Sequence, residues 1–289
     1  MTKKALLVGI NYKKNEELKV SGNSELSGCI NDVTNVKKVL MENFDYHEDN
    51  IKFMTDDTCI KPTKKNIEEA LCWLVNDNCP GDTLVFHYSG HGSNQADTNR
   101  DESDSKDESL CPLDFETAGM FVDDCIFEYI KKVQKDVTLY CFSDSCHSGT
   151  VFDLKYNYRS LCVPIIPPIP PKTPDKNLPV LYHPEEWTSN FDFSIEHSKK
   201  VKGNIISFSG CLDSETSADA YLDNVAQGAF TFCLLKFFQR NLCDGKIENI
   251  KNLYVLKQLV ANLDMYGFSD QNSQLSVSDN SLVVSYFSL

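Results

Sequence analysis

Cys146 has polar and small neighbours that a buried core thiol does not need. The stretch DSCHSG (144–149) surrounds it and directly follows VTLYCFS (137–143), an apolar run typical of a β-strand. A nucleophilic cysteine has to be exposed and activated as a thiolate, and a substrate backbone has to approach it. Small residues after the cysteine allow that approach. We therefore interpret Cys146 as a candidate nucleophile.

A second strand ends close to a histidine that lies between two glycines. The run DTLVFHYS (82–89) predicts a strand, and His91 follows in the exit loop SGHGS (89–93). Flexible flanks can hold an imidazole over a reaction site instead of in the core. A cysteine hydrolase needs a thiolate, a general acid/base within reach and donors for the oxyanion. Cys146 and His91, at two separate strand exits, favour such a pair.

Two other histidines are rivals for the role of the base. His87 lies inside the predicted strand, and we interpret it as packed or hydrogen-bonded. His147 adjoins Cys146 in sequence, but adjacent side chains at a strand exit diverge, so we expect a structural role for it.

Short apolar strands that alternate with helical runs must position these residues. Helical periodicity is clearest at Cys29, Val33, Val36 and Leu40. We expect helices over 29–40, 62–74, 123–135, 225–240 and 252–264, and strands over 3–10, 51–54, 82–89, 137–143, 204–210 and 282–287. This order predicts an α/β fold with a mainly parallel sheet covered on both faces. Active sites of such sheets gather at the carboxyl ends of the strands.

One domain is expected to span residues 1–289. The proline-rich excursion 160–200, which contains PIIPPIPPKTP, cannot hold a helix. It separates a larger part, 1–159, which contains both candidate residues, from a smaller part, 201–289.

Composition limits the possible partners. The net charge of -14 and the sequence pI of about 4.8 argue against nucleic acid or an anionic membrane as a partner. They are compatible with a cationic substrate or bound metal cations. Twelve cysteines without a secretory signal or a CxxC pair indicate free thiols in a reducing, cytoplasmic compartment. No apolar run approaches the roughly 20 residues of a membrane span.

Several motifs in order resemble the metacaspases, which are caspase-fold cysteine peptidases. The caspase signature QACxG around the nucleophile is absent. The matching stretches are GCINDV (28–33), HYSGHG (87–92), CPLDF (111–115), VDDCI (122–126), DSCHSG (144–149), FDLKYNY (152–158), FSGCLDSETSADA (208–220) and GAFT (228–231). The resemblance covers nearly the whole chain.

The resemblance implies a caspase-like α/β/α sandwich with Cys146 as nucleophile and His91 as acid/base. Backbone N–H groups of Gly92 and Cys146 would form the oxyanion hole. The long amino-terminal prodomain of some relatives is missing from the sequence, so we expect no recruitment through one.

Two aspartates accompany the candidate pair. Asp144 precedes Cys146 by two residues, so in extended backbone both side chains face one way. Asp32 follows Cys29 by about one helical turn and shares its face. Without a resemblance, both aspartates would be interpreted as stabilisers of helix ends or loops. The resemblance places them on the floor of a primary specificity pocket that selects Arg or Lys, with Cys29 and Ser89 as polar lining.

The acidic stretch DTNRDESDSKDE (97–108) has three interpretations. The simplest is a solvated loop. An EF-hand with Asp97, Asn99, Asp101 and Glu108 as ligands is disfavoured, because position 6 is glutamate instead of glycine and no helix pair flanks the stretch. The resemblance implies a calcium site. Its ligands would be Asp107, Asp123, Asp124 and Asp153. The adjacent charges of Asp123 and Asp124 slightly favour the metal.

These observations predict a calcium-dependent cysteine endopeptidase that cleaves proteins or peptides after Arg or Lys through an acyl-enzyme. We expect it to act as a monomer. An inactive caspase-fold scaffold is one alternative, but the presence of both His91 and Cys146 argues against it. A legumain-like peptidase specific for Asn is another, and the paired pocket aspartates argue against that one.

Overall fold

The computed structural model describes residues 1–96, 106–160, 191–195, 200–243 and 247–289. Most of the predicted proline-rich excursion and positions 97–105 of the acidic stretch lie outside the described residues. The EF-hand interpretation falls mainly on those positions.

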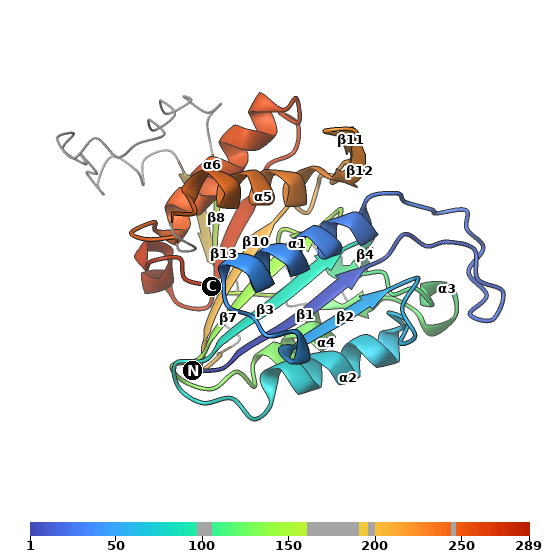
Figure 1. Cartoon of the computed structure of the whole chain (residues 1–289), viewed down its shortest axis with the longest axis horizontal. Coiled ribbons are helices and arrows are strands. Elements are labelled where there is room, and N and C mark those ends of the chain that lie inside the picture. Colours follow the sequence, from blue (N-terminus) through green and yellow to red (C-terminus); the bar gives the residue numbers. More distant parts are fainter. Residues whose placement is uncertain (97–105, 161–190, 196–199, 244–246) are drawn as a thin grey trace.

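The centre of the fold is an eight-stranded mixed sheet, mainly parallel as predicted (Figure 1). Its strand order is β2-β1-β3-β7-β10-β13-β8-β9, and the first five strands in that order run parallel. The last three are added antiparallel. The parallel strands are β1 (Lys3–Gly9), β2 (Ile51–Thr55), β3 (Thr83–Ser89), β7 (Thr138–Asp144) and β10 (Asn204–Ser209). The antiparallel strands are β8 (Tyr156–Ser160), β9 (Phe191–Ile195) and β13 (Gln274–Val277).

Helices cover both faces of this sheet (Figure 1). One face packs against α1 (Cys29–Asn43), α5 (Ala229–Asn241) and α6 (Asn252–Met265), and the other against α2 (Lys64–Val75) and α4 (Asp123–Ile130). The buried residues of α1 include Val33, Val36 and Leu40, the periodic apolar positions of the sequence. No helix in the described part of the chain is both long and apolar enough to cross a membrane.

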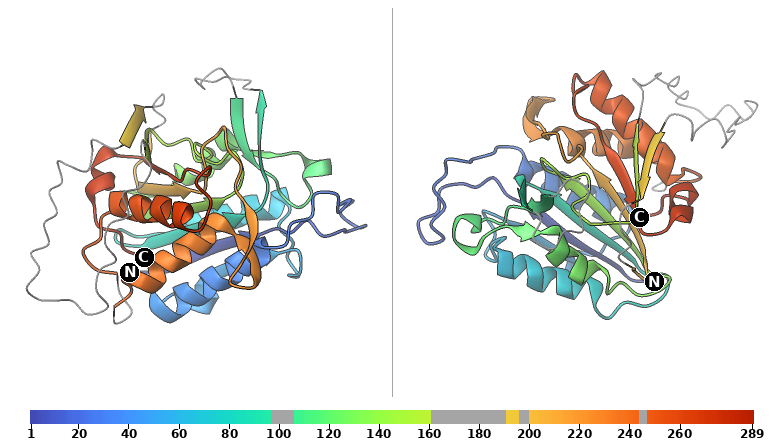
Figure 2. Two further views of the ribbon diagram at one scale, coloured as in Figure 1. Left: turned by 90° about the horizontal axis from the view of Figure 1, so that it is seen from above. Right: turned by 180° about the vertical axis from the view of Figure 1, so that it is seen from behind.

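Smaller elements extend from this body. Strands β4 (Gly92–Ala96), β5 (Lys106–Leu110) and β6 (Phe121–Val122) form an antiparallel sheet of their own, and the pair β4–β5 stands away from the main sheet (Figure 2). Strands β11 (Asp219–Leu222) and β12 (Val225–Gly228) form a hairpin that leads into α5. Short elements elsewhere in the described residues are α3 (Phe115–Ala118), η1 (Glu48–Asn50) and η4 (Asn280–Val284).

The predicted last strand, 282–287, is wrong. Residues 280–284 form the 3₁₀ helix η4, whose first turn is capped by Asp279 as its carboxylate accepts the N–H of Ser281 at 2.9 Å. Leu282 and Val283 enter the core from this helix. The sheet uses β13 instead, in which all four residues are buried. A short apolar run does not distinguish these outcomes by its periodicity.

Three predicted helix boundaries move by three residues or more, and the first of them is the end of α1, at Asn43 instead of 40. Helix α4 ends at Ile130 instead of 135, and α5 begins at Ala229 instead of 225. Residues 225–228 form β12, paired with β11.

Candidate active site

The candidate nucleophile and base follow two neighbouring strands. β3 and β7 are parallel, and their last residues, Ser89 and Asp144, are partners in register. His91 and Cys146 therefore each lie two residues beyond paired strand ends. A Cβ atom at Gly92 would overlap the carbonyl oxygen of Cys146, so the two exit loops are in direct contact. The structure thus brings the predicted pair of loops together.

Cys146 is half-buried at the end of β7. Its Sγ lies 3.8 Å from the carbonyl oxygen of Ser217. Burial raises the pKa of this thiol above its usual value. A nearby positive charge would therefore be needed to favour the thiolate.

The ring of His91 is oriented by a backbone carbonyl. Its Nε2 lies 2.8 Å from the carbonyl oxygen of Ser24, in the segment between β1 and α1. A carbonyl can only accept, so Nε2 bears the proton in this contact. In the neutral ring Nδ1 is then the acceptor nitrogen.

The rival histidines have structural surroundings. His87 is fully buried in β3, its Nε2 is 3.3 Å from Oγ1 of Thr231, and burial lowers its pKa to about 3. Nδ1 of His147 contacts the carbonyl oxygen of Asp213 and lies 3.5 Å from Nδ2 of Asn94. These positions agree with the sequence-based interpretation of both residues.

The four residues predicted to form a specificity pocket meet beneath the two loops. Asp32, at the start of α1, is fully buried, and the hydroxyl of Ser89 donates to its Oδ2 at 2.7 Å. The Cys29 thiol is buried beside them, and burial together with the charge of Asp32 raises its pKa. Asp144 is 5% exposed.

Both carboxylates also accept donors from the segment that leads into α5. The N–H of Gly228 donates to both oxygens of Asp32 at 3.0 Å. The N–H of Thr231 donates to Asp144 at 2.8 Å, and the hydroxyl of Ser217 donates to its other oxygen. The bonds from Gly228 and Thr231 stabilise the start of α5, a helix-end role of the kind that the residue types alone suggested. A substrate cation must share or replace these donors.

The two aspartates are close enough to affect each other's ionisation. A Cβ atom at Gly228 would overlap an oxygen of Asp144 and lie 2.9 Å from an oxygen of Asp32, so only glycine fits between them. Burial raises the pKa of Asp32 well above its usual value, and the charge of Asp144 raises it further. Two such carboxylates do not both ionise readily unless a cation joins them.

Sequence reasoning assigned no role to Ser24, Ser217, Gly228 or Thr231. The last three lie within the motifs FSGCLDSETSADA and GAFT, so the motifs could have indicated them. Ser24 contributes only its backbone carbonyl, and no side-chain type signals that role.

The predicted calcium ligands lie in one region but do not form a ready metal site. Asp107, Asp123 and Asp153 are buried, whereas Asp124 is partly exposed. Burial raises the pKa of Asp123 to about 7, and the charges of Asp153 and Asp107 contribute. Glu108, which is also buried, accepts the hydroxyl of Thr150 at 2.8 Å. Among the described residues, no three His, Cys, Asp or Glu side chains are arranged so that they could hold a metal ion.

A surface pocket of about 320 Å³ lies between α1, the β11–β12 hairpin and α5. It includes Asn31 and Gln227, the chain neighbours of Asp32 and Gly228, but none of the predicted site residues.

Comparison with known proteins decides the family. The family model described as "Metacaspase, peptidase C14 domain" matches residues 3–155, more than half of the chain. The chain belongs to the metacaspase family. It is 36% identical over 274 residues to Metacaspase-1A of Neurospora crassa, covering 87% of this chain and 59% of the relative. It is 38% identical over 245 residues to Metacaspase-1 of Arabidopsis thaliana, covering 83% of this chain and 60% of the relative. The chain thus spans about three fifths of the length of these metacaspases.

Solved structures agree on the fold. Protein GSU0716 from Geobacter sulfurreducens superposes with a TM-score of 0.64 at 21% identity, covering 99% of this chain and 97% of that one. Caspase-1 from Spodoptera frugiperda gives a TM-score of 0.51 at 9% identity, covering 95% and 85%. The predicted caspase-like α/β fold is therefore confirmed.

Proposed function

We propose that this chain is a calcium-dependent cysteine endopeptidase that cleaves proteins after Arg or Lys. The proposal rests on how the fold places the two candidate loops and the two pocket aspartates. The Cys146 and His91 loops touch at the ends of paired strands, directly beside two buried aspartates that share one glycine. A nucleophile, a base and a site for a cation are thereby adjacent.

The contacts support a specific order of events. With Nε2 donating to Ser24, Nδ1 of His91 accepts the thiol proton of Cys146. The thiolate attacks the scissile carbonyl, and backbone N–H groups of Gly92 and Cys146 stabilise the oxyanion. The imidazolium returns the proton to the leaving amine as the C–N bond breaks, which leaves a thioester on Cys146. His91 then takes a proton from water, whose attack releases the acid and restores the thiol.

Specificity would come from Asp32 and Asp144. A guanidinium or ammonium group between them relieves the repulsion from Asp144 that, together with burial as the larger cause, raises the pKa of Asp32. A side chain of Asp at the cleaved bond would add a third negative charge, and that of Asn would leave the carboxylates uncompensated. The pair therefore favours basic residues.

Calcium is proposed from the chemistry of the donors. Burying several carboxylates together is costly unless a cation or protons neutralise them. Asp107, Asp123, Asp124 and Asp153 offer the oxygen ligands that calcium prefers. When bound, the ion would supply positive charge that lets these side chains approach one another. We further propose that the protein acts in the cytoplasm, because its many cysteines suit a reducing compartment and all those in the described residues are free. We also propose that it acts as a monomer.

The substrate class is tested with fluorogenic peptides that differ only in the residue before the cleaved bond. With calcium present, peptides ending in Arg or Lys should be hydrolysed, and those ending in Asp or Asn should be hydrolysed at least about 100-fold more slowly, the scale of one lost charge pair. Efficient cleavage after Asp would contradict the pocket assignment. Efficient cleavage after Asn would favour a legumain-like peptidase, and no cleavage of any peptide would favour the scaffold.

Calcium should raise both activity and thermal stability. A metal that binds only the folded state stabilises it by about 2.7 kcal/mol at 100 times its dissociation constant. The melting temperature should therefore rise when calcium is added and fall back to its calcium-free value when a chelator is added. Magnesium should substitute poorly, because it demands tighter octahedral geometry.

Asp123→Asn tests the site itself. It should weaken both calcium effects, whereas the matched change Asp136→Asn, on the turn before β7, should leave both unchanged. Full activity in chelator, together with a melting temperature that does not change with calcium, would remove the metal from the mechanism.

A further inference from the structure

Two buried tyrosine hydroxyls contact the backbone of His91. Tyr12 and Tyr88 are 1% and 0% exposed, and their hydroxyl oxygens lie 3.1 Å apart. The N–H of His91 donates to the hydroxyl of Tyr12 at 2.9 Å. The hydroxyl of Tyr88 donates to the carbonyl of His91 at 2.8 Å. Both backbone groups of the candidate base are thus held by side chains.

The same hydroxyls contact Cys111, which follows β5. Tyr12 donates to the carbonyl of Cys111 at 2.6 Å, and the N–H of Cys111 lies 3.2 Å from the hydroxyl oxygen of Tyr88. That N–H also donates to the carbonyl of His91 at 3.1 Å. One assignment uses each hydroxyl proton once: Tyr12 to Cys111 and Tyr88 to His91. Each hydroxyl oxygen then accepts one backbone N–H, so the group is fully satisfied.

Tyr12 also packs directly on the candidate base. Its ring centroid is 4.7 Å from that of His91, with the planes tilted by 38°. The ring therefore limits the rotation of the imidazole on one side, while the carbonyl of Ser24 holds its Nε2.

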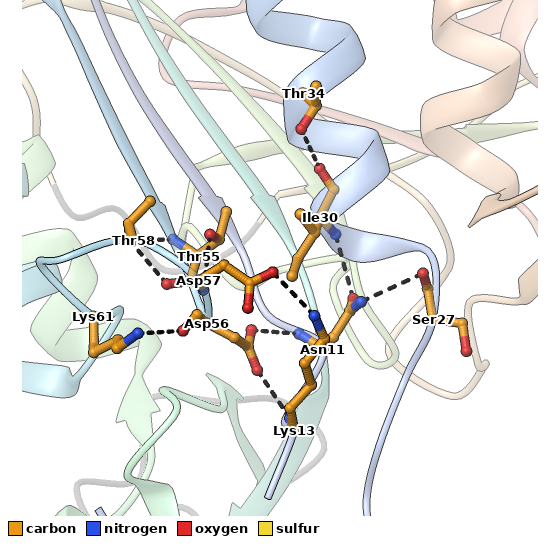
Figure 3. A network of polar contacts seen from close by, with 10 residues as sticks. All are labelled: Asn11, Lys13, Ser27, Ile30, Thr34, Thr55, Asp56, Asp57, Thr58 and Lys61. Atoms are coloured by element: carbon orange, nitrogen blue, oxygen red, sulfur yellow. Dashed lines mark hydrogen bonds and ion pairs between the residues drawn. The ribbon is translucent and has the colours of Figure 1, made fainter. Parts of the chain in front are cut away.

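The segment that follows β1 holds Tyr12 in an unusual backbone conformation. Its φ of 54° is in the left-handed region, which a bulky residue rarely adopts. The carboxylate of Asp56 fixes both sides of this residue, because it accepts the N–H of Asn11 at 2.8 Å and that of Lys13 at 2.9 Å (Figure 3). The Asn11 side chain in turn accepts the N–H of Ile30 in α1 at 3.3 Å (Figure 3). Such a conformation persists only where its surroundings over-determine it.

We propose that Tyr12 and Tyr88 are positioning residues for the reaction, because their hydroxyls fix the backbone of His91 and the Tyr12 ring fixes its imidazole. This inference rests on the proposed function of His91 as acid/base. Neither tyrosine has to touch substrate. The two hydroxyls act on the distance and angle over which a proton passes between Nδ1 and the thiol of Cys146.

The test compares Tyr12→Phe and Tyr88→Phe with Tyr140→Phe as a matched control. Tyr140 is 1% exposed, and its hydroxyl accepts the N–H of Ser288 at 3.0 Å, so this change also deprives a backbone N–H of its partner, but far from the loops. Misplacing a reacting group by about 1 Å can cost about 100-fold. We expect kcat to fall by about 10- to 100-fold in Tyr12→Phe and Tyr88→Phe, with KM within about twofold of wild type.

A second readout follows the thiolate directly. Iodoacetamide inactivates through the thiolate, so its rate against pH reports the Cys146–His91 pair. In Tyr12→Phe and Tyr88→Phe the rate near neutral pH should fall, because a displaced imidazolium stabilises the thiolate less. Tyr140→Phe should keep the wild-type kcat and inactivation profile, even if its melting temperature falls as much as theirs.

The inference and the proposed function fail in different ways. If His91→Ala is inactive but Tyr12→Phe and Tyr88→Phe behave like Tyr140→Phe, the positioning role is wrong and the proposed function stands. If His91→Ala keeps its turnover, there is no base to position and both are wrong. Each tyrosine is tested by its own variant. The positioning role can therefore still be tested if only one of the two variants folds.

Discussion

Cys146→Ala should abolish peptide hydrolysis, by at least about 10⁴-fold in kcat, while the protein remains folded. The thiol is the proposed nucleophile, and alanine cannot form the acyl-enzyme. Stability should change little, because Cys146 is only half-buried and its Sγ makes a weak contact of 3.8 Å to Ser217. Turnover of fluorogenic Arg peptides and the melting temperature measure the two effects. Cys79→Ala, which removes an exposed thiol, is the control and should be as active as wild type.

His91→Ala should cause nearly the same loss, because nucleophile and base act as a unit. The double variant of Cys146 and His91 should then be no slower than either single variant. Two losses that multiplied would show that the residues act independently. Wild-type turnover in Cys146→Ala would exclude the proposed mechanism altogether.

Asp144→Asn should lose most activity on Arg and Lys peptides without unfolding the protein. Removing one partner of a buried charge pair typically costs about 2–5 kcal/mol, or about 30- to 5,000-fold in kcat/KM. The amide oxygen can still accept the N–H of Thr231, so the start of α5 keeps its bond. This separates the loss of charge from the loss of a helix-end acceptor.

Asp82→Asn is the matched control for Asp144→Asn. Asp82 is 4% exposed, and its carboxylate accepts the N–H of Cys79 at 2.9 Å and that of Thr2, so it has a comparable set of backbone donors. It precedes the amino end of β3, whereas the candidate site lies at the carboxyl end. The Asp82→Asn variant should therefore keep its activity on Arg and Lys peptides. Equal activity of Asp144→Asn and wild type would leave only the helix-end role for Asp144.

The same pair predicts how KM depends on pH. The pKa of Asp32 is raised by burial and by Asp144, so the pair keeps a proton at pH values where an exposed aspartate is already ionised. A guanidinium requires both charges, and its binding should release that proton. KM for Arg peptides should therefore fall as pH rises through the raised pKa, and Asp144→Asn should flatten this dependence. A pH-independent KM in the wild type would show that the pair is already fully ionised.

The sequence determined the principal strands and the candidate pair, because those signals are local. Apolar runs that end in small and polar residues indicated strand exits at His91 and Cys146, and β3 and β7 end next to them. The 3.6-residue periodicity of Val33, Val36 and Leu40 indicated the buried face of α1. The family motifs indicated Asp32 and Asp144, and the fold places both carboxylates against Gly228.

Only the tertiary structure decided the elements whose formation depends on distant partners. The run 282–287 is apolar enough for a strand, but β13 occupies the place beside β10, and residues 280–284 close into a 3₁₀ helix. The antiparallel pairs β4–β5 and β11–β12 have little apolar alternation, and pairing with the partner strand fixes them. The predicted calcium ligands come from three segments, and their charges meet only through the fold.

Backbone partners of the site were also beyond the sequence. The carbonyl of Ser24 orients the ring of His91, and the N–H of Gly228 donates to Asp32. Every residue except proline has the same backbone donor and acceptor, so residue type does not reveal which of them the fold will use. Tyr12 bonds the backbone of a residue 79 positions away, and only the packing of the two loops brings its hydroxyl there.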